Sequence, residues 1–148
     1  MGFDRTSGTY RERMKRIARK AEVLNDACDE MTADIEVVEG DLASAKVGVE
    51  VEMEHPFYSN TIDNPNRPNT PLDREWKLGY AKVEGTWHIV VNKYEISLDE
   101  GGNRFVVPKG PQPLAKASRL LRMEAHPQIN GLLELIDATL SMKADYQN

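Results

Sequence analysis

The sequence predicts an α+β fold in which an antiparallel β-meander of four or five strands is flanked by one N-terminal helix and two C-terminal helices. Apolar residues recur every three or four positions near both ends of the chain and every second position near the middle. Short turn-forming sequences separate the central segments, and connections this short join neighbouring antiparallel strands. Because 148 residues are the usual size of one domain, we expect residues 1–148 to form a single α+β domain.

The N-terminal helix is predicted from a capping signal and an apolar seam. Thr9 and Glu12 have the spacing of a capping box, in which each side chain satisfies a free amide of the first helical turn. The seam that follows, at intervals of four and three residues, consists of Tyr10, Met14, Ile17, Ala21, Leu24, Cys28 and Met31. Such a repeat is typical either of a helix packed on its own sheet or of one edge of a coiled coil. Since two seam positions are small and charged pairs beside the seam are sparse, we expect intramolecular packing, with a contact between copies as the alternative.

The next segments are predicted as strands separated by turns and by one long loop. Residues 34–39 suggest a short strand, and Gly40-Asp41 suggest a turn. In residues 47–54 the odd positions are apolar and the even positions are glycine or glutamate, which predicts a strand with one buried face. Four prolines and four asparagines in residues 55–75 predict a long loop. Loops of this length tend to be functional or mobile, so we expect this loop to offer a binding surface, with a mobile excursion as the alternative.

A hairpin and one further strand complete the predicted sheet. Residues 76–83 and 87–96 are rich in aromatic and β-branched side chains, and residues 84–86 between them supply a tight turn. A second turn at residues 99–103 leads into a last strand at residues 104–107. These segments give the meander its consecutive strands.

The C-terminal part is predicted to be helical. Pro108, Pro111 and Pro113 are expected to end the sheet, with Pro113 as the first residue of a helix that reaches about residue 125. His126-Pro127 interrupts it, and a final helix is expected over residues 128–143. The apolar face of this last helix is broad, which suggests burial against more than one neighbour or a subunit contact.

Three residues are weak candidates for catalysis: His88, His55 and Asp73. The alternation of the hairpin strand places His88 on the same face as Asn92 and Tyr94. If Asp73 approached from the long loop, His88 would have a carboxylate partner for general-base chemistry. No spacing in the sequence enforces that meeting, and a hydrogen-bonded structural histidine is the plainer interpretation.

We expect neither a metal nor a cofactor. Glu50, Glu52 and Glu54 share one strand face and His55 follows them, but residues two apart on a strand lie nearly 7 Å apart and do not chelate one ion without other ligands. A solvated strand face explains the glutamates. The common signatures of hydrolases, nucleotide-binding proteins, zinc sites and redox sites do not occur in the sequence.

The net charge of -5 is distributed unevenly along the chain. Residues 1–20 carry seven bases and two acids, a net of +5, whereas residues 21–54 carry eleven acids and one base, a net of -10. The acidic stretch would repel a polyanion, and no aromatic residues are interleaved with the bases, so nucleic-acid binding is not expected. The opposite charges are complementary between copies of the chain, which favours a homo-oligomer.

The single cysteine, Cys28, cannot form an internal disulfide, and the sequence shows neither a secretory leader nor an apolar run long enough to span a bilayer. We therefore expect a cytoplasmic protein with no membrane association.

The function predicted from these patterns is that of a non-enzymatic protein-binding or regulatory module that self-associates. Its expected interaction residues are Met14, Ile17 and Leu24 on the helix and Glu50, Glu52 and Glu54 on the sheet. In a variant of this hypothesis, the glutamates imitate a polyanion and block another protein. The alternative is a small hydrolase or lyase with a site between the sheet and the 55–75 loop, so the sequence leaves open whether the protein is an enzyme.

Overall fold

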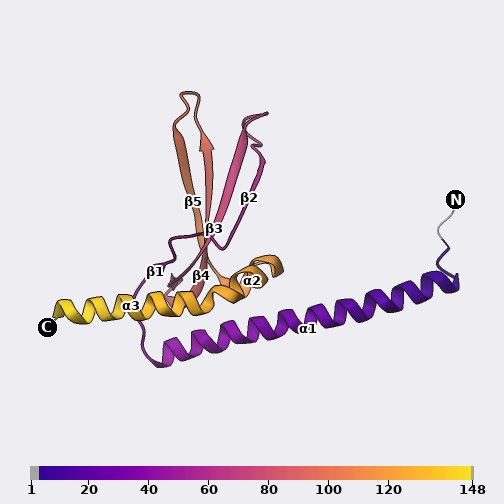
Figure 1. Ribbon diagram of the computed structural model, residues 1–148, viewed down its shortest axis with the longest axis horizontal. Coiled ribbons are helices and arrows are strands. Elements are labelled where there is room, and N and C mark those ends of the chain that lie inside the picture. Colours follow the sequence, from indigo (N-terminus) through magenta and orange to yellow (C-terminus); the bar gives the residue numbers. More distant parts are fainter. Residues whose placement is uncertain (1–3, 148) are drawn as a thin grey trace.

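The computed structural model describes residues 4–147 and confirms the predicted α+β class. The elements in chain order are α1 (Gly8–Ser44), β1 (Val51–Glu52), β2 (Tyr58–Asp63), β3 (Pro71–Val83), β4 (Thr86–Leu98), β5 (Arg104–Pro113), α2 (Arg119–Ala125) and α3 (Ile129–Gln147). The sheet is antiparallel with the order β1-β3-β4-β5, and β2 also pairs with β3. The helices gather at one end of the sheet, and the opposite end extends away from them (Figure 1).

Helix α1 is longer at both ends than the sequence predicts. Its N-cap is Ser7, whose hydroxyl accepts a hydrogen bond from the Tyr10 amide at 3.1 Å, and not Thr9 of the expected capping box. The predicted strand at residues 34–39 and turn at Gly40-Asp41 are wrong, because the helix continues through both. Ile35, Val38 and Leu42 follow the helical spacing of three and four, and their packing on the sheet outweighs the cost of about 1 kcal/mol for one helical glycine.

The alternating segment after α1 is only partly a strand. Burial follows the predicted alternation, since Val49 and Val51 are buried while Glu50 and Glu52 are exposed. Only β1 is paired, with Val51 opposite Tyr80 and Glu52 opposite Gly79. The two strands meet closely at Gly79, where an added Cβ would lie 2.6 Å from the Val51 carbonyl oxygen.

The prediction of a long loop at residues 55–75 is wrong for most of its length. β2 pairs with the first half of β3 from Tyr58 opposite Trp76 to Asp63 opposite Pro71, which leaves residues 64–70 as the connection. The turn-forming residues therefore mark the tip of a hairpin, and Pro71 stands at the first position of a strand, where proline is tolerated. Asn69 has the positive φ of 65° that this tip requires.

The β3–β4 hairpin is confirmed, and its turn residues Glu84 and Gly85 have φ values of 52° and 85°. Both values are positive, as in the type I′ turns that suit two-residue hairpins. The expectation that prolines end the sheet after residue 107 is wrong, because β5 continues to Pro113. β5 is an edge strand that pairs only with β4. A proline that lacks an amide on the unpaired side of such a strand removes no hydrogen bond from the sheet.

The predicted helix from Pro113 is shorter than expected. A 3-10 turn at Leu114–Lys116 precedes α2, for which Ser118 is the N-cap. A second 3-10 turn at His126–Gln128 confirms the expected interruption, and α3 then confirms the final helix.

The core lies where the C-terminal half of α1, the base of the sheet, α2 and α3 meet. Its fully or almost fully buried side chains come from all of these parts and from the 3-10 turn before α2: Ile35, Leu78, Tyr80, Ile89, Val91, Leu114, Ala125 and Leu132. Tyr80 also stacks on Trp87 at a centroid distance of 5.2 Å. No helix of residues 4–147 lies over the far end of the sheet (Figure 1).

The close approach at Gly79 leads to a prediction about stability. Gly79→Ala should lower the free energy of unfolding by about 1–3 kcal/mol, because the new methyl group must displace the backbone of β1. Gly40→Ala is the matched control: no atom lies within 4 Å of the added Cβ, and replacing a helical glycine should raise the free energy of unfolding by up to about 1 kcal/mol. Urea unfolding of both variants measures the two effects, and equal effects would contradict the contact.

Candidate functional site

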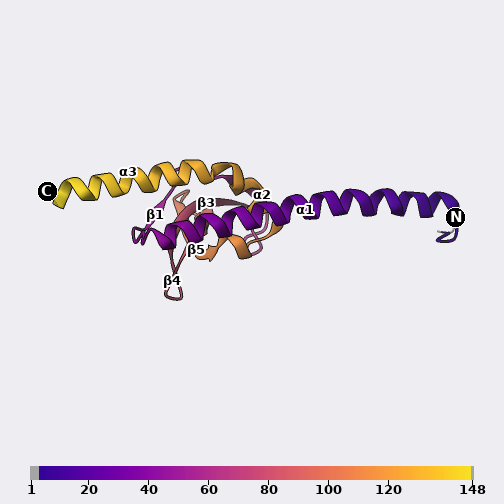
Figure 2. The ribbon, with the colours of Figure 1, turned by 90° about the horizontal axis from the view of Figure 1, so that it is seen from below.

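The N-terminal half of α1 projects beyond the rest of the protein. In two perpendicular views it runs past α2 and away from the strands, while its C-terminal half crosses below the base of the sheet (Figures 1 and 2). Every residue from 11 to 26 is exposed. At 1.5 Å per residue this stretch of helix is about 24 Å long.

The apolar seam crosses the boundary between the two halves of α1. Cys28 is only 4% exposed, as intramolecular packing predicts, whereas Met14, Ile17 and Leu24 are 43%, 49% and 42% exposed. The expectation that the whole seam packs on the protein's own sheet is therefore wrong for these three residues. The physical reason is length, because α1 is longer than the surface that the sheet and α2 offer it.

We call the sheet together with α2 and α3 the body of the protein. Two contacts from α2 mark where α1 first meets this body. Arg119 Nη2 donates to Asn25 Oδ1 at 2.7 Å, and one turn further along α2, Arg122 Nη1 donates to Thr32 Oγ1 at 2.6 Å. The side chains N-terminal to Asn25 form the surface that we call the projecting seam: Met14, Ile17, Ala21 and Leu24. Beside it, a shallow hollow of about 400 Å³ is lined by Arg19, Lys20, Val23, Leu24 and Ala27.

This surface has the chemistry of a helix–helix contact. Single exposed apolar side chains are normal, but several on one helical face at spacings of three and four are what a partner helix buries. The bases and acids around them favour solvation of the exposed helix.

Two histidines hold the C-terminal half of α1 to the body. His88 Nδ1 on β4 lies 2.7 Å from Glu39 Oε1, and His126 Nε2 lies 2.9 Å from Asp34 Oδ2. The predicted carboxylate partner of His88 therefore exists, but it comes from α1 and not from residues 55–75. The sequence does not indicate this contact, because its local pattern predicts a strand at residues 34–39.

The candidate catalytic residues are not brought together. Asp73 lies opposite Ile96, eight residues along β4 from His88, which corresponds to about 26 Å. Asp73 accepts a hydrogen bond from Thr61 Oγ1 at 2.7 Å, and His55 is exposed between β1 and β2. Among residues 4–147, no group of three or more histidine, cysteine, aspartate or glutamate side chains is arranged to hold a metal ion.

The three glutamates of the predicted interaction face are exposed, but one of them is engaged by the sheet. Glu52 Oε2 accepts hydrogen bonds from Asn92 Nδ2 at 2.7 Å and from the Tyr94 hydroxyl at 2.5 Å. Burial, together with this bond to Glu52, raises the pKa of Tyr94 to about 12. The Lys77 ammonium lies 5.4 Å from the centroid of the Tyr94 ring. The alternation of β4 had placed Asn92 and Tyr94 on one face, but only the register of β1 shows that Glu52 reaches them.

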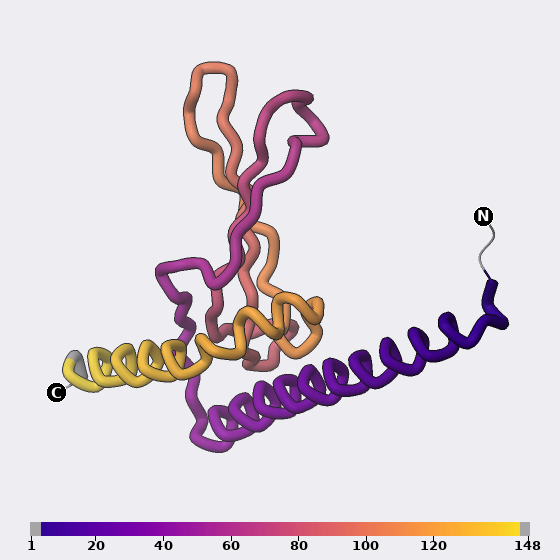
Figure 3. The backbone as a smooth tube through the Cα atoms, turned by 45° about the vertical axis from the view of Figure 1, so that its right-hand side comes forward, coloured from indigo at the N-terminus to yellow at the C-terminus, as the bar shows by residue number. Residues whose placement is uncertain are grey.

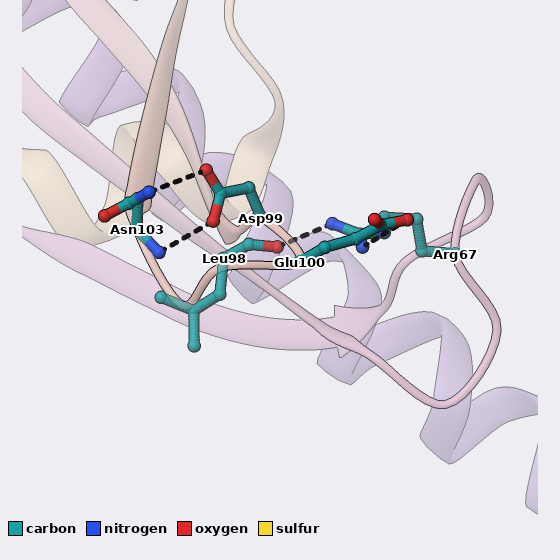
Figure 4. Close-up of polar contacts among 5 residues, drawn as sticks. All are labelled: Arg67, Leu98, Asp99, Glu100 and Asn103. Carbon is teal, nitrogen blue, oxygen red and sulfur yellow. Dashed lines mark hydrogen bonds and ion pairs between the residues drawn. The ribbon is translucent and has the colours of Figure 1, made fainter.

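The far end of the sheet, where the sequence predicted a binding loop, is held by polar contacts. Arg67 reaches from the β2–β3 tip to the β4–β5 tip, where Nη1 donates to the Leu98 carbonyl oxygen at 2.8 Å and Nη2 lies 3.9 Å from Glu100 Oε1 (Figure 4). Asp99 accepts bonds from the amide and side chain of Asn103 at 2.8 and 3.1 Å (Figure 4). Both tips lie far from the helices (Figure 3). A hollow of about 190 Å³ lies beneath the β2–β3 tip, and a second hollow of about 600 Å³ on the same tip is lined by Thr61, Ile62, Asp63, Asn69, Thr70 and Pro71.

The Tyr94–Glu52 bond makes the titration of Tyr94 a test of the sheet register. Its pKa in the folded protein exceeds the usual value of about 10, so the neutral phenol is favoured by folding. The stability that Tyr94 contributes is therefore complete below about pH 10 and is lost as the pH rises towards 12. The difference in tyrosinate absorbance between the wild type and Tyr94→Phe isolates this group.

Glu52→Gln removes the negative charge from the phenol's partner and should lower the pKa of Tyr94. Glu50→Gln, on the same exposed stripe, is the control and should leave that titration unchanged. An ionisation of Tyr94 near pH 10 in the wild type would show that the bond is not formed in solution.

No helix among residues 4–147 combines the length and the apolar character that crossing a membrane requires. In comparisons with known proteins, the chain matches no family model, no curated protein and no solved structure.

Proposed function

We propose that this chain is a non-enzymatic protein-binding module that self-associates through the projecting seam of α1. The observation that carries the proposal is the change in burial along one continuous seam, from Cys28 at 4% exposed to Leu24, Ile17 and Met14 at more than 40%. The same periodic pattern that packs the helix on its body continues where the body has ended. A second helix would bury what the body leaves uncovered.

The projecting half is ready for binding because it is already helical. Isolated helices of this length are marginal in water because the first turn is costly to form. Here the packed half of α1 supplies the nucleus, and Ala, Arg, Lys, Glu, Leu and Met in residues 11–24 favour propagation. Binding of a partner therefore does not include the entropic cost of forming this helix.

The proposal also includes a cellular location and a second contact surface. We assign the protein to the cytoplasm, because its one cysteine is a buried free thiol. The exposed Glu50 and Glu54 are offered as a second contact surface, for a basic partner or in imitation of a polyanion. We do not propose a hydrolase or lyase, since His88 contacts Glu39 of α1 and Asp73 lies opposite Ile96, eight residues along β4 from His88.

The test of self-association is the oligomeric state of the seam variants. Sedimentation velocity over micromolar concentrations should show a dimer for the wild type and at least tenfold weaker association for Met14→Glu/Ile17→Glu, because the buried charges would lack partners. The thermal transition of the dissociated variant should match that of the wild type at concentrations where the wild type is also monomeric, since both side chains are exposed in the single chain.

Phe105→Glu/Val106→Glu is the matched control. Phe105 and Val106 are 60% and 47% exposed on β5, away from α1, so this variant adds the same two charges at apolar positions outside the seam. It should associate like the wild type. A wild type that stays monomeric at both low and high salt would refute self-association.

A further inference from the structure

We infer that the second copy binds the projecting seam in an antiparallel orientation, with Ile17 facing Ala21 of the second copy and Met14 facing Leu24 of the second copy. This inference rests on the proposed self-association and specifies its geometry. Three independent features of the chain point to it: the position of the body relative to the seam, the heptad positions and the distribution of charge.

The body excludes the parallel orientation. Cys28 belongs to the seam and is buried by the chain's own body, so from about residue 28 onward the body lies on the seam side of α1. Two parallel helices that faced each other through their seams would have both bodies in the same space between them. In the antiparallel pair, residue 28 of one helix faces residue 10 of the other, so each body lies beside the first turn of the other helix and the two bodies are at opposite ends.

The heptad positions provide a matching register. With Met14 and Ala21 at a positions, Ile17 and Leu24 are at d positions. An antiparallel pair with its two-fold axis near Arg19 brings each a residue opposite a d residue and uses only exposed side chains. The small Ala21 near the axis lets the two helices approach closely.

The charges favour the same register. Residues 8–18 carry four bases and one acid, a net of +3, whereas residues 20–30 carry one base and four acids, a net of -3. The antiparallel pair lays the positive segment of each helix beside the negative segment of the other. The parallel pair would lay like charges side by side within the screening distance of about 8 Å at physiological salt.

Disulfide cross-linking tests the orientation. Met14→Cys and Leu24→Cys are made separately, in the wild type and with Cys28→Ala. A mixture of the two chains should form a disulfide between positions 14 and 24 at least tenfold faster than either variant forms one with itself. In the inferred register, the two copies of position 14 are ten residues apart along the axis, about 15 Å, which is too far for a disulfide.

Sedimentation of the same samples tests self-association separately from the antiparallel orientation. A monomeric wild type would refute both self-association and its geometry. A dimer in which each variant cross-links with itself, or in which neither cross-links, would keep self-association and overturn the antiparallel arrangement.

The salt dependence of dimerisation of the unmodified chain is a second test. The antiparallel dimer should weaken several-fold as salt rises from low to high concentration, because screening removes the attraction between opposite segments. A dimer that tightens with salt would overturn the inference.

Discussion

The packing of the C-terminal half of α1 into the core is the interaction on which the other features depend. Ile35 is fully buried among side chains from the sheet, α2 and α3, and it lies in the middle of that half. His88 and His126 add polar contacts to Glu39 and Asp34 on either side of the packed surface. Because this half is held from several directions, the helix has a fixed direction, and its remaining residues are carried out into solvent.

A fixed direction matters for the projecting half. A flexible tail with the same apolar residues would bury them in transient contacts, but a helix that continues from a packed one presents them in a constant order. The seam is narrow, and long charged side chains flank it. In the proposed self-association these features favour one specific contact over unspecific aggregation, since an unmatched surface would bury charges without compensation.

The sequence predicted the class, the main hairpin and the last helix, because periodic burial is a local signal that each segment carries by itself. Residues 34–39 were misassigned since a short apolar run fits a strand or a helix equally well, and only the sheet beneath Ile35 decides between them. Residues 58–63 and 108–113 were missed for a related reason. Prolines and asparagines mark the ends and edges of strands as well as loops, and strand order is not visible in the sequence.

The candidate site shows the same division between local and non-local information. Met14, Ile17 and Leu24 were identified from their spacing, but spacing does not say whether a seam meets its own sheet or another molecule. That depends on how far the body extends along α1, and the contact between Arg119 and Asn25, 94 residues apart in sequence, marks the limit. The charge reversal near residue 20 lies within a few residues of this limit. One helix therefore carries a self-complementary charge pattern that begins on the uncovered part and continues over exposed residues just beyond this limit, which is what a symmetric contact between two copies requires.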